Sequence, residues 1–282
     1  MKIDCPDFNL SVTLDSGQVF GFTADTEGRY EGVLLGHPVK MRQQDRCLHV
    51  ENGKSALSEA LVRHYFDLDR DLGEIYSLLR SDEALRASRD TFKGLRLIRQ
   101  DPWEALACFI LSSNNNIKRI MGIYRNLCAH FKGFPSPLQI ARSHENVLRE
   151  LGLGYRAPFL WATAKFLSTN PDYLETVRAA EYEEARERVL SFPGIGPKVA
   201  DCVLLYGFHK LEAFPVDVWI LRAVRRLYFK NRKISEDKAR SFGMKRWKHN
   251  AGYMQQHLFH SARMGVYDIL PVPRRRKVHE PV

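Results

Sequence analysis

The stretch LSFPGIGPKVADCVLLYGFHKLEAFPVDV, residues 190–218, decides the fold of this chain. Within it, Gly194 and Gly196 bracket one aliphatic residue, a pattern typical of a tight turn whose backbone approaches another molecule closely. Pro197 suits the first position of a helix, and apolar residues recur at helical spacing over residues 198–206. We therefore expect two helices joined by a hairpin turn, with the first amides of the second helix exposed as an anion-binding site.

Two side chains of this stretch are candidates for chemistry. Lys198 lies in the first helical turn, where the helix dipole disfavours a positive charge, so its amine should lose a proton more readily than a free lysine. A neutral amine is a nucleophile. Asp217 directly precedes a helix-patterned run at residues 218–228, which places it as an N-cap carboxylate. The residues alone also allow a simpler interpretation, in which Lys198 contacts a phosphate and Asp217 only caps its helix.

The composition favours an intracellular protein with a polyanionic partner. The chain has 282 residues, enough for one large or two modest domains, and a net charge of +10. A soluble basic protein with no nucleic-acid role would fit the same charge. The five cysteines are scattered without a CxxC motif, so neither a zinc nor an iron–sulfur site is expected. The first residues show no signal-peptide pattern, and the longest apolar run, residues 105–111, is too short to span a bilayer.

The N-terminal part is predicted to be rich in β-structure. Apolar and polar residues alternate over residues 8–14, which predicts a strand, and Asp15, Ser16 and Gly17 then form a turn. Short apolar runs separated by turn residues follow, at residues 19–23, 29–35, 39–43 and 47–50. These runs predict a twisted antiparallel sheet.

Helical spacing dominates the remainder of the chain. We expect helices at residues 56–66, 72–79, 82–92, 102–111, 117–131, 138–141, 145–150, 158–167, 182–190, 198–206, 218–228 and 249–264. The predicted fold class is α+β. An N-terminal antiparallel β-sheet domain with flanking helices covers residues 1–95, and a larger all-α domain covers residues 96–282.

Two loops have compositions suited to contacts with a polar partner. Three consecutive asparagines, beginning at Asn114, make a poor helix interior because their side chains compete for backbone groups. The segment LGLGYR, residues 151–156, presents Tyr155 and Arg156 from a glycine-rich turn. An aromatic ring can wedge into a duplex, and an arginine offers a planar array of donors. An ordinary polar loop and a packed tyrosine are the alternatives.

The last predicted helix carries Gln255 and Phe259, which lie four residues apart and hence on one face. A glutamine offers a base edge one donor and one acceptor, whereas a phenylalanine stacks on a base; a surface glutamine above a core phenylalanine is the alternative. A basic tail at residues 273–277 either helps DNA binding or acts as a nuclear import signal. A basic run could track phosphates or form a solvated face: Arg222, Arg225, Arg226, Lys230, Arg232 and Lys233.

In combination these motifs resemble the helix-hairpin-helix DNA glycosylases, the endonuclease III superfamily. Within it, PGIGPKVADC followed by FPVDV is most similar to the 8-oxoguanine DNA glycosylases, and LDSGQVF, SSNNNIKRI and LGLGYRA extend the resemblance over nearly the whole chain. The resemblance implies a bifunctional glycosylase/AP lyase of base excision repair. Such an enzyme excises 8-oxoguanine, preferably opposite cytosine, from double-stranded DNA.

The resemblance also assigns roles to individual residues. It makes Lys198 the Schiff-base nucleophile and Asp217 its acidic partner, beside a base pocket of Gly17, Cys202, Gln255 and Phe259. Opposite the lesion, Asn114 fills the vacated space, Tyr155 wedges the duplex, and Arg119 and Arg156 contact the orphaned cytosine. The DNA backbone would lie along Gly194, Gly196 and Trp219. The family commonly has histidine at this last position, and tryptophan offers only one N–H and no titratable nitrogen.

Gly17 has a specific expected function. Guanine N7 is an acceptor, whereas 8-oxoguanine carries N7–H, so a fixed backbone carbonyl aimed at N7 separates the two bases. The turn at residues 15–18 resembles the family segment that supplies this carbonyl, and Gly17 is the matching residue. The alternative is that Gly17 merely closes a hairpin.

Partners and rival functions complete the prediction. We expect a monomer acting with DNA inside the cell, without membrane, redox cofactor or catalytic metal; a structural alkali or alkaline-earth ion on the hairpin carbonyls is the one ion allowed. One rival is a sister glycosylase for alkylated bases, which typically has the aspartate but not Lys198. The other is a non-enzymatic hairpin module, which would need neither the Lys198/Asp217 pair nor the Gln255/Phe259 helix.

Overall fold

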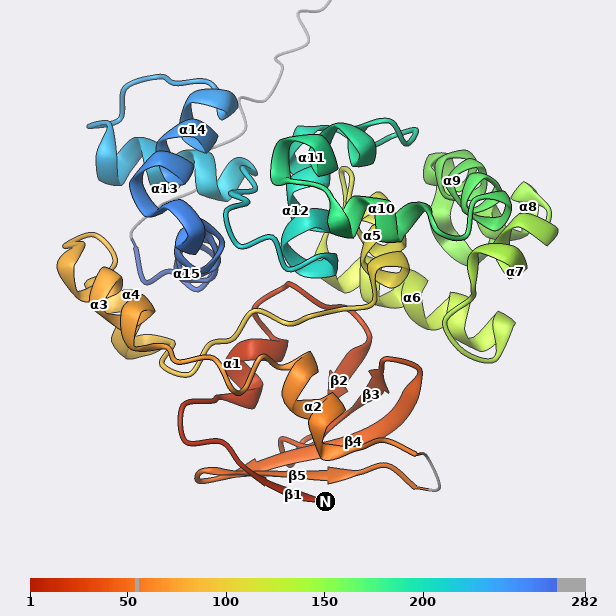
Figure 1. Cartoon of the computed structure of the whole chain (residues 1–282), viewed down its shortest axis with the longest axis horizontal. Coiled ribbons are helices and arrows are strands. Elements are labelled where there is room, and N and C mark those ends of the chain that lie inside the picture. The colour runs from red at the N-terminus through yellow and green to blue at the C-terminus, as the bar shows by residue number, and fades with distance from the viewer. Residues whose placement is uncertain (54–55, 268–282) are drawn as a thin grey trace, which may run out of the picture.

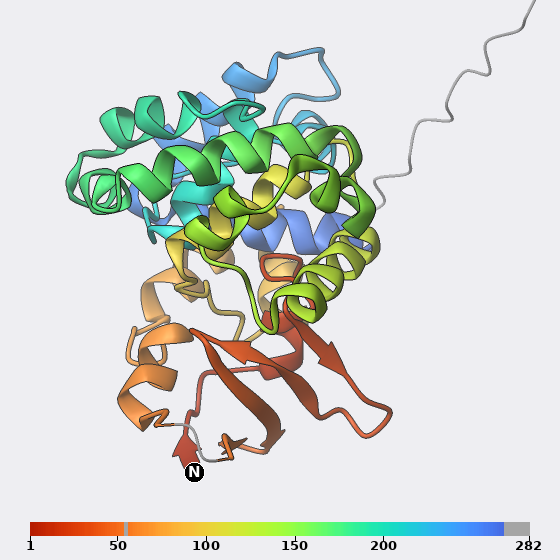
Figure 2. The same ribbon diagram turned by 90° about the vertical axis from the view of Figure 1, so that its right-hand side faces the viewer.

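A computed structural model describes residues 1–53 and 56–267 of the chain. The basic tail predicted at residues 273–277 lies outside the described residues. A five-stranded sheet forms the base of the molecule, and helices form the layers above it (Figures 1 and 2). Within the described residues no helix is both long and apolar enough to cross a membrane.

The sheet is antiparallel throughout, as the alternating pattern predicted, with strand order β1-β5-β4-β3-β2. The register pairs Ile3 with Leu48 and Met41 with Val50, and these four side chains face the core. The strands are β1 (Lys2–Asp4), β2 (Phe22–Ala24), β3 (Tyr30–Leu34), β4 (His37–Gln44) and β5 (Cys47–Glu51).

The strand predicted at residues 8–14 is wrong, because this segment forms helix α1 (Leu10–Leu14). Asn9 caps the helix, and its side-chain oxygen accepts a hydrogen bond from the Val12 amide at 3.0 Å. Leu10 and Leu14 are buried and fit both the predicted alternation and one face of a helix, whereas the buried Thr13 fits only the helix. Alternation over a few residues therefore did not distinguish the two. The short strand β1 was not predicted.

The helices follow the predicted order closely. Predicted helices at residues 117–131, 182–190 and 218–228 coincide with α6 (Ile117–Phe131), α11 (Tyr182–Leu190) and α13 (Val218–Tyr228). The others are α2 (Glu59–Tyr65), α3 (Gly73–Ser81), α4 (Arg86–Thr91), α5 (Pro102–Leu111), α7 (Pro137–Arg142), α8 (Glu145–Leu148), η1 (Arg149–Leu153), η2 (Gly154–Arg156), α9 (Ala157–Thr169), α10 (Tyr173–Ala179), α12 (Pro197–Gly207), α14 (Glu236–Trp247), η3 (Lys248–Asn250) and α15 (Ala251–Arg263).

Two of these helices, α10 and α14, were missed from the sequence. Helix α14 reads EDKARSFGMKRW, in which charged residues interrupt the apolar spacing and Gly243 lowers helix propensity. The tertiary structure explains the glycine, because a Cβ at this position would come within 2.6 Å of the Phe214 ring. Packing on a neighbour thus overrides a weak local preference.

Buried apolar residues form two clusters. One joins the sheet to α1 and α2 and extends from Ile3 to Leu68, with Ile98 added. The other fills the helical part, and it includes Phe20 from the N-terminal part, Ile75 and Leu79 of α3, and Leu85, the N-cap of α4. Both helices contact α15. The segment after α1 therefore packs into the helical layer through Phe20. The domain boundary at residue 95 stays a prediction.

Candidate active site

The predicted hairpin joins α11 to α12. Gly194 has φ +75°, a backbone conformation in which a side chain would be strained, and a Cβ there would collide with the ring of Phe159. Gly196 is the N-cap of α12 and Pro197 occupies its first turn. Gly194 is exposed and Gly196 half-buried, so the backbone here is open to a partner. Of the hairpin carbonyls, that of Phe192 already accepts a bond from the Ile195 amide at 3.3 Å, and the cation stays a prediction.

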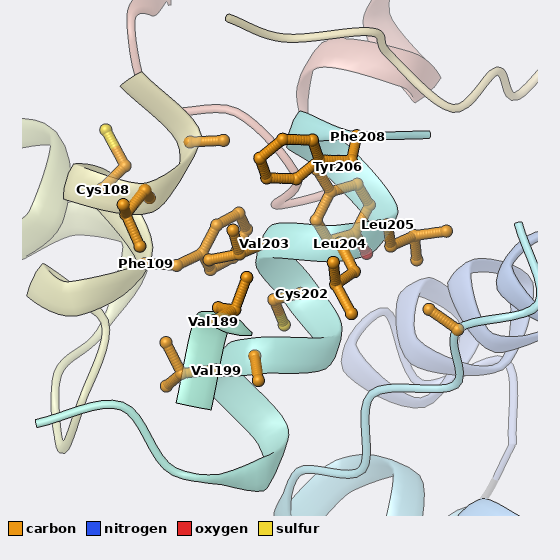
Figure 3. Packing of buried hydrophobic residues seen from close by; sticks show 14 of the residues in the cluster. Cys108, Phe109, Val189, Val199, Cys202, Val203, Leu204, Leu205, Tyr206 and Phe208 are labelled. Carbon is orange, nitrogen blue, oxygen red and sulfur yellow. The ribbon is translucent and has the colours of Figure 1, made fainter. Parts of the chain in front are cut away.

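Lys198 is half-buried in the first turn of α12. Its Nζ lies 3.5 Å from Ser112 Oγ and 5.7 Å from the centre of the Phe109 ring. Figure 3 shows Phe109 of α5 facing the buried side of α12, which carries Val199, Cys202, Val203 and Tyr206. The amine thus lies near an aromatic face and a hydroxyl, and its charge also acts on the Cys202 thiol and the Asp217 carboxylate.

Asp217 is the N-cap of α13, and its Oδ1 accepts a hydrogen bond from the Ile220 amide at 2.8 Å. Burial raises the pKa of Asp217 above its ordinary value, while the Ile220 amide and the charge of Lys198 act in the opposite direction. The cap that the sequence predicted is confirmed. Because Lys198 and Asp217 line the same groove, however, the cap does not account for the whole arrangement.

That groove, of about 590 Å³, opens between α5, α6, α12, α13 and α15. A smaller pocket of about 50 Å³ leads inward from it and shares Lys198 and Asp217. The four residues predicted to form a base pocket all line the smaller pocket: Gly17, Cys202, Gln255 and Phe259. This volume suits a few water molecules, and a purine would fit only if the pocket widened.

Sequence reasoning missed three further residues that line the inner pocket: Phe109, Tyr206 and Pro215. Phe109 stacks on Tyr206 with ring centres 5.4 Å apart and meets Phe20 edge-to-face at 5.7 Å. In the sequence these residues look like ordinary core positions, so no local signal marked them. Together they form an apolar wall behind Lys198.

Cys202 is buried one helical turn beyond Lys198. Burial raises the pKa of the Cys202 thiol to about 11, against the opposing charge of Lys198. The thiol is therefore neutral near pH 7 and can pack against a flat ring. Within the described residues no group of three or more His, Cys, Asp or Glu side chains could hold a metal ion.

Gln255 is buried in α15, and its amide nitrogen donates to the Pro215 carbonyl at 3.1 Å. Its Oε1 is buried without a hydrogen-bond partner. A buried unpaired acceptor lowers stability, and at a pocket wall it can be satisfied by a donor from a ligand or from water. The sequence predicted one donor and one acceptor from this residue, and the structure leaves the acceptor open.

The turn that carries Gly17 is held between the sheet and the helices. Gln18 is fully buried, donates to the Arg96 carbonyl at 2.8 Å and accepts from the Ile98 amide at 2.8 Å. From α15, Gln256 donates to the Ser16 carbonyl at 3.0 Å. Gln256 was not predicted, although it adjoins Gln255. These bonds place Gly17 at the pocket with little freedom to move.

The asparagine loop and the Tyr155 loop meet at one side of the groove. Asn114 and Arg119 are exposed, and among the described residues no hydrogen bond of the Arg119 guanidinium is found. Tyr155 is 49% exposed and donates to the Ser113 carbonyl at 3.0 Å. An exposed ring held at its hydroxyl is suited to act as a wedge.

Arg156 is placed differently from Arg119. It is 2% exposed, its Nε donates to the Ser113 carbonyl at 2.8 Å, and its Nη2 donates to the Asn114 carbonyl at 3.0 Å. Its guanidinium also lies 4.3 Å from the centre of the Tyr155 ring. The side chain therefore fixes the two loops together, and its contact with cytosine stays a prediction that would need an exchange of these bonds.

Residues near the start of α13 have mixed roles. Trp219 lines the groove, with Arg222 at 6.0 Å from its ring centre. Arg225, part of the predicted basic run, donates to the Ile234 carbonyl at 2.5 Å, so it holds the chain after α13 rather than standing free. The phosphate contacts expected of Trp219 and of the basic run stay predictions.

An unpredicted ion network fixes the helix that carries Lys198. Asp201 is buried and accepts from Tyr182 Oη at 2.8 Å, Arg186 Nε at 2.8 Å and Arg240 Nε at 3.2 Å. The three donors come from α11 and α14, so α12 is tied to both neighbours. An aspartate in the apolar run after the hairpin was the only sequence signal for this network.

The fold and the site define a helix-hairpin-helix protein with a lysine and an aspartate at the mouth of a small inner pocket, and comparison with known proteins identifies its family. Residues 1–106 match the family described as 8-oxoguanine DNA glycosylase, N-terminal domain. Residues 107–249 match the HhH-GPD superfamily of base excision DNA repair proteins. The chain belongs to the 8-oxoguanine DNA glycosylase family, and it is a DNA N-glycosylase with DNA lyase activity.

Individual relatives match this chain over most of their own length. A protein of Methanothermobacter thermautotrophicus named "probable N-glycosylase/DNA lyase" is 32% identical, covering 96% of this chain and 98% of the relative. The N-glycosylase/DNA lyase of Saccharomyces cerevisiae is 34% identical over 81% of this chain and 70% of its own. The 8-oxoguanine glycosylase/lyase of Clostridium acetobutylicum, solved with double-stranded DNA containing cytosine opposite 8-oxoG, has a TM-score of 0.87 at 31% identity, covering 95% of this chain and 99% of the other.

Proposed function

We propose that this protein excises 8-oxoguanine from double-stranded DNA, preferably opposite cytosine, and then nicks the strand through a Schiff base on Lys198. The observation that carries the proposal is the inner pocket, where a lysine and a half-buried aspartate adjoin an unpaired glutamine oxygen and an apolar wall. The rival class of alkylated-base glycosylases typically has the aspartate without this lysine, and a plain DNA-binding module needs none of these groups. In this proposal the protein binds double-stranded DNA as a monomer and uses no cofactor.

The proposed reaction begins with extrusion of the nucleotide, because a base inside a duplex is out of reach. The neutral amine of Lys198 attacks C1′ of the sugar, and the bond from C1′ to N9 breaks with its electron pair leaving on the base. Asp217 offsets the positive charge that grows on the sugar. One proton of the amine goes to the departing base and the other to O4′ as the C1′–O4′ bond breaks, which opens the ring and gives a Schiff base. Loss of a C2′ proton then expels the 3′ phosphate by β-elimination.

Base recognition follows from three kinds of contact. Cys202 and Phe259 provide apolar surfaces for the two faces of the ring. Gln255 Oε1 accepts from the N1–H and amino group of a guanine-type base, which satisfies its unpaired oxygen. The Gly17 carbonyl accepts from N7–H, which 8-oxoguanine has and guanine lacks. Guanine would leave this carbonyl facing a lone pair, at a cost of ~1–3 kcal/mol.

The direct test is incubation with 8-oxoguanine:cytosine DNA and borohydride, which reduces a Schiff base to a stable adduct. We expect a covalent protein–DNA product together with free 8-oxoguanine. Base release without an adduct would support a lysine-independent glycosylase instead. Binding without either product would support the non-enzymatic module.

Replacing Arg119 should flatten the preference for the opposite base. Arginine only donates, and an orphaned cytosine presents O2 and N3 as acceptors, whereas adenine places an amino group in the corresponding region. A wrong base typically costs ~1–3 kcal/mol. We expect wild-type single-turnover excision to be faster opposite cytosine than adenine, and Arg119→Ala to bring the two rates together. Equal rates in the wild type would contradict the assigned role, and Lys118→Ala is the exposed neighbouring control.

Replacing Gly17 should remove 8-oxoguanine excision. Its φ is +85°, and an added Cβ would lie 2.6 Å from Arg263 Nη1 and 2.9 Å from Ile117 Cδ1, so Gly17→Ala must displace the turn. We expect a loss of single-turnover excision and a small fall in Tm. Gly28→Ala is the control, since it also has positive φ but no atom within 4 Å of the added carbon. A Gly17→Ala enzyme that excises at the wild-type rate would show that N7 is recognised elsewhere.

A further inference from the structure

The Gly17 turn is held by hydrogen bonds to the carbonyls on both sides of it, while its own carbonyl stays open. Within residues 1–53 and 56–267 no hydrogen bond to the Gly17 carbonyl is found, although Gly17 lines the inner pocket. Side chains from distant segments donate to the neighbouring carbonyls: Arg263 to Asp15 at 2.6 Å, Gln256 to Ser16 at 3.0 Å and Gln100 to Gln18 at 2.7 Å. The Gly17 carbonyl is therefore the acceptor of this turn that remains for a ligand.

The amide of Gln256 is fully buried and is occupied at both ends. Its Nε2 donates to the Ser16 carbonyl, and its Oε1 is hydrogen-bonded to the Tyr206 hydroxyl. Because a carbonyl only accepts, Gln256 must turn its NH₂ group to Ser16 and its oxygen to Tyr206, whose hydroxyl then donates. The Tyr206 hydroxyl thus fixes which way the amide points.

Tyr206 also belongs to the wall of the inner pocket. Its ring lines the pocket, and its backbone carbonyl accepts from the Gln100 amide at 3.0 Å. The Gln100 side chain in turn donates to the Gln18 carbonyl. Tyr206 is therefore connected to the carbonyls on both sides of Gly17, through one glutamine on each side.

We propose that Tyr206 and Gln256 form a positioning pair that holds the Gly17 carbonyl where N7–H of a flipped 8-oxoguanine donates to it. A glycine has wide backbone freedom, so a glycine that must present its carbonyl at one point needs restraint from outside. A peptide unit is planar, so holding the Ser16 carbonyl also holds the Gly17 nitrogen. The inference rests on the proposed function, and both residues act through Gly17 rather than on the reacting atoms.

The test compares Gln256→Met with the wild type on two DNA duplexes, each with cytosine opposite the site. On 8-oxoguanine DNA we expect single-turnover excision to fall roughly tenfold or more, because a small displacement of a recognising group is costly in rate. On DNA with an abasic site, nicking through Lys198 should change by a much smaller factor, because no base is present for the Gly17 carbonyl to contact. A general loss of structure would lower both rates together.

A second variant tests whether Tyr206 acts through Gln256. Tyr206→Phe keeps the ring at the pocket wall and removes the hydroxyl that orients the amide. We expect its excision of 8-oxoguanine to fall by less than that of Gln256→Met, and the double variant to be no slower than Gln256→Met alone, since both changes act on the Ser16 carbonyl. Additive losses would show independent effects and would overturn the pair.

The control is Gln43→Met, which removes a half-buried amide that donates to the Phe8 carbonyl and accepts from the Leu10 amide, both at 2.7 Å, outside the groove. It should keep both rates. Failure of the wild type to excise 8-oxoguanine would defeat the proposed function itself. Wild-type excision with an equally active Gln256→Met would defeat only this inference, as would an equal loss on both duplexes. If Gln256→Met does not fold, Tyr206→Phe decides, and full excision by that folded variant would overturn the pair.

Discussion

Lys198→Gln should lose base release and borohydride trapping together, while DNA binding changes little. Glutamine keeps much of the length of lysine but has no nucleophilic amine. Removing a nucleophile typically costs on the order of a thousandfold or more in rate. The measurements are single-turnover release of 8-oxoguanine, the yield of covalent adduct, and Kd for the same duplex.

The surroundings of Lys198 make this variant easy to interpret. The amine lies 3.5 Å from Ser112 Oγ and also interacts with the Cys202 thiol, and within the described residues it forms no salt bridge, so its replacement breaks no ion pair of the fold. Lys210→Gln is a suitable control, because its amine donates to backbone carbonyls, that of Ala180 at 2.6 Å, away from the groove. Substantial base release by a folded Lys198→Gln enzyme would remove this lysine from the nucleophile role.

Asp217→Asn should slow excision on the order of a hundredfold, because the amide keeps the helix cap but lacks the charge that offsets the developing sugar cation. The pH dependence of the excision rate should also reflect the ionisation of Asp217. Burial raises the pKa of Asp217 above the ordinary 3.8, so the wild-type rate should fall with decreasing pH earlier than an exposed aspartate would allow. This acid limb should be missing from the residual activity of the variant.

Stability provides the control for Asp217→Asn. A folded-state pKa raised above the unfolded value means that the ionised carboxylate lowers stability at neutral pH, and that folding favours the protonated form at lower pH. The variant should therefore have an unchanged or higher Tm at pH 7, where it also keeps an acceptor for the Ile220 amide. An unchanged excision rate in this stable protein would reduce Asp217 to a helix cap.

The hairpin, Lys198 and Asp217 could be placed on their elements from short motifs, because residues close in sequence determine their conformation. The hairpin glycines, Pro197 and Lys198 lie within one turn of each other, and Asp217 is defined by the helix it begins. The apolar spacing of α6, α11 and α13 also set their bounds correctly. Where the chemistry of a residue and its neighbours in sequence determine its conformation, the sequence was sufficient.

The remaining features depend on contacts between distant segments. Alternation at residues 8–14 suited a strand, yet the cap at Asn9 and packing above the sheet make it α1. Arg156 was assigned to a base, and only the structure shows its bonds to the asparagine loop. Gln256 and Arg263 received no role because the carbonyls they hold, those of Ser16 and Asp15, are at the other end of the chain.

The bonds from α15 to the Gly17 turn also bear on the protein during its synthesis. They join residues separated by 240 and 248 positions, so the base pocket is one of the last features of the fold to become complete. Domains fold as they leave the ribosome, N-terminal part first. A nascent chain, or one cut short by a premature stop before α15, would possess Lys198 and Asp217 without Gln255 and Phe259, which line the inner pocket. Completion of the inner pocket thus depends on α15, the last helix of the described residues.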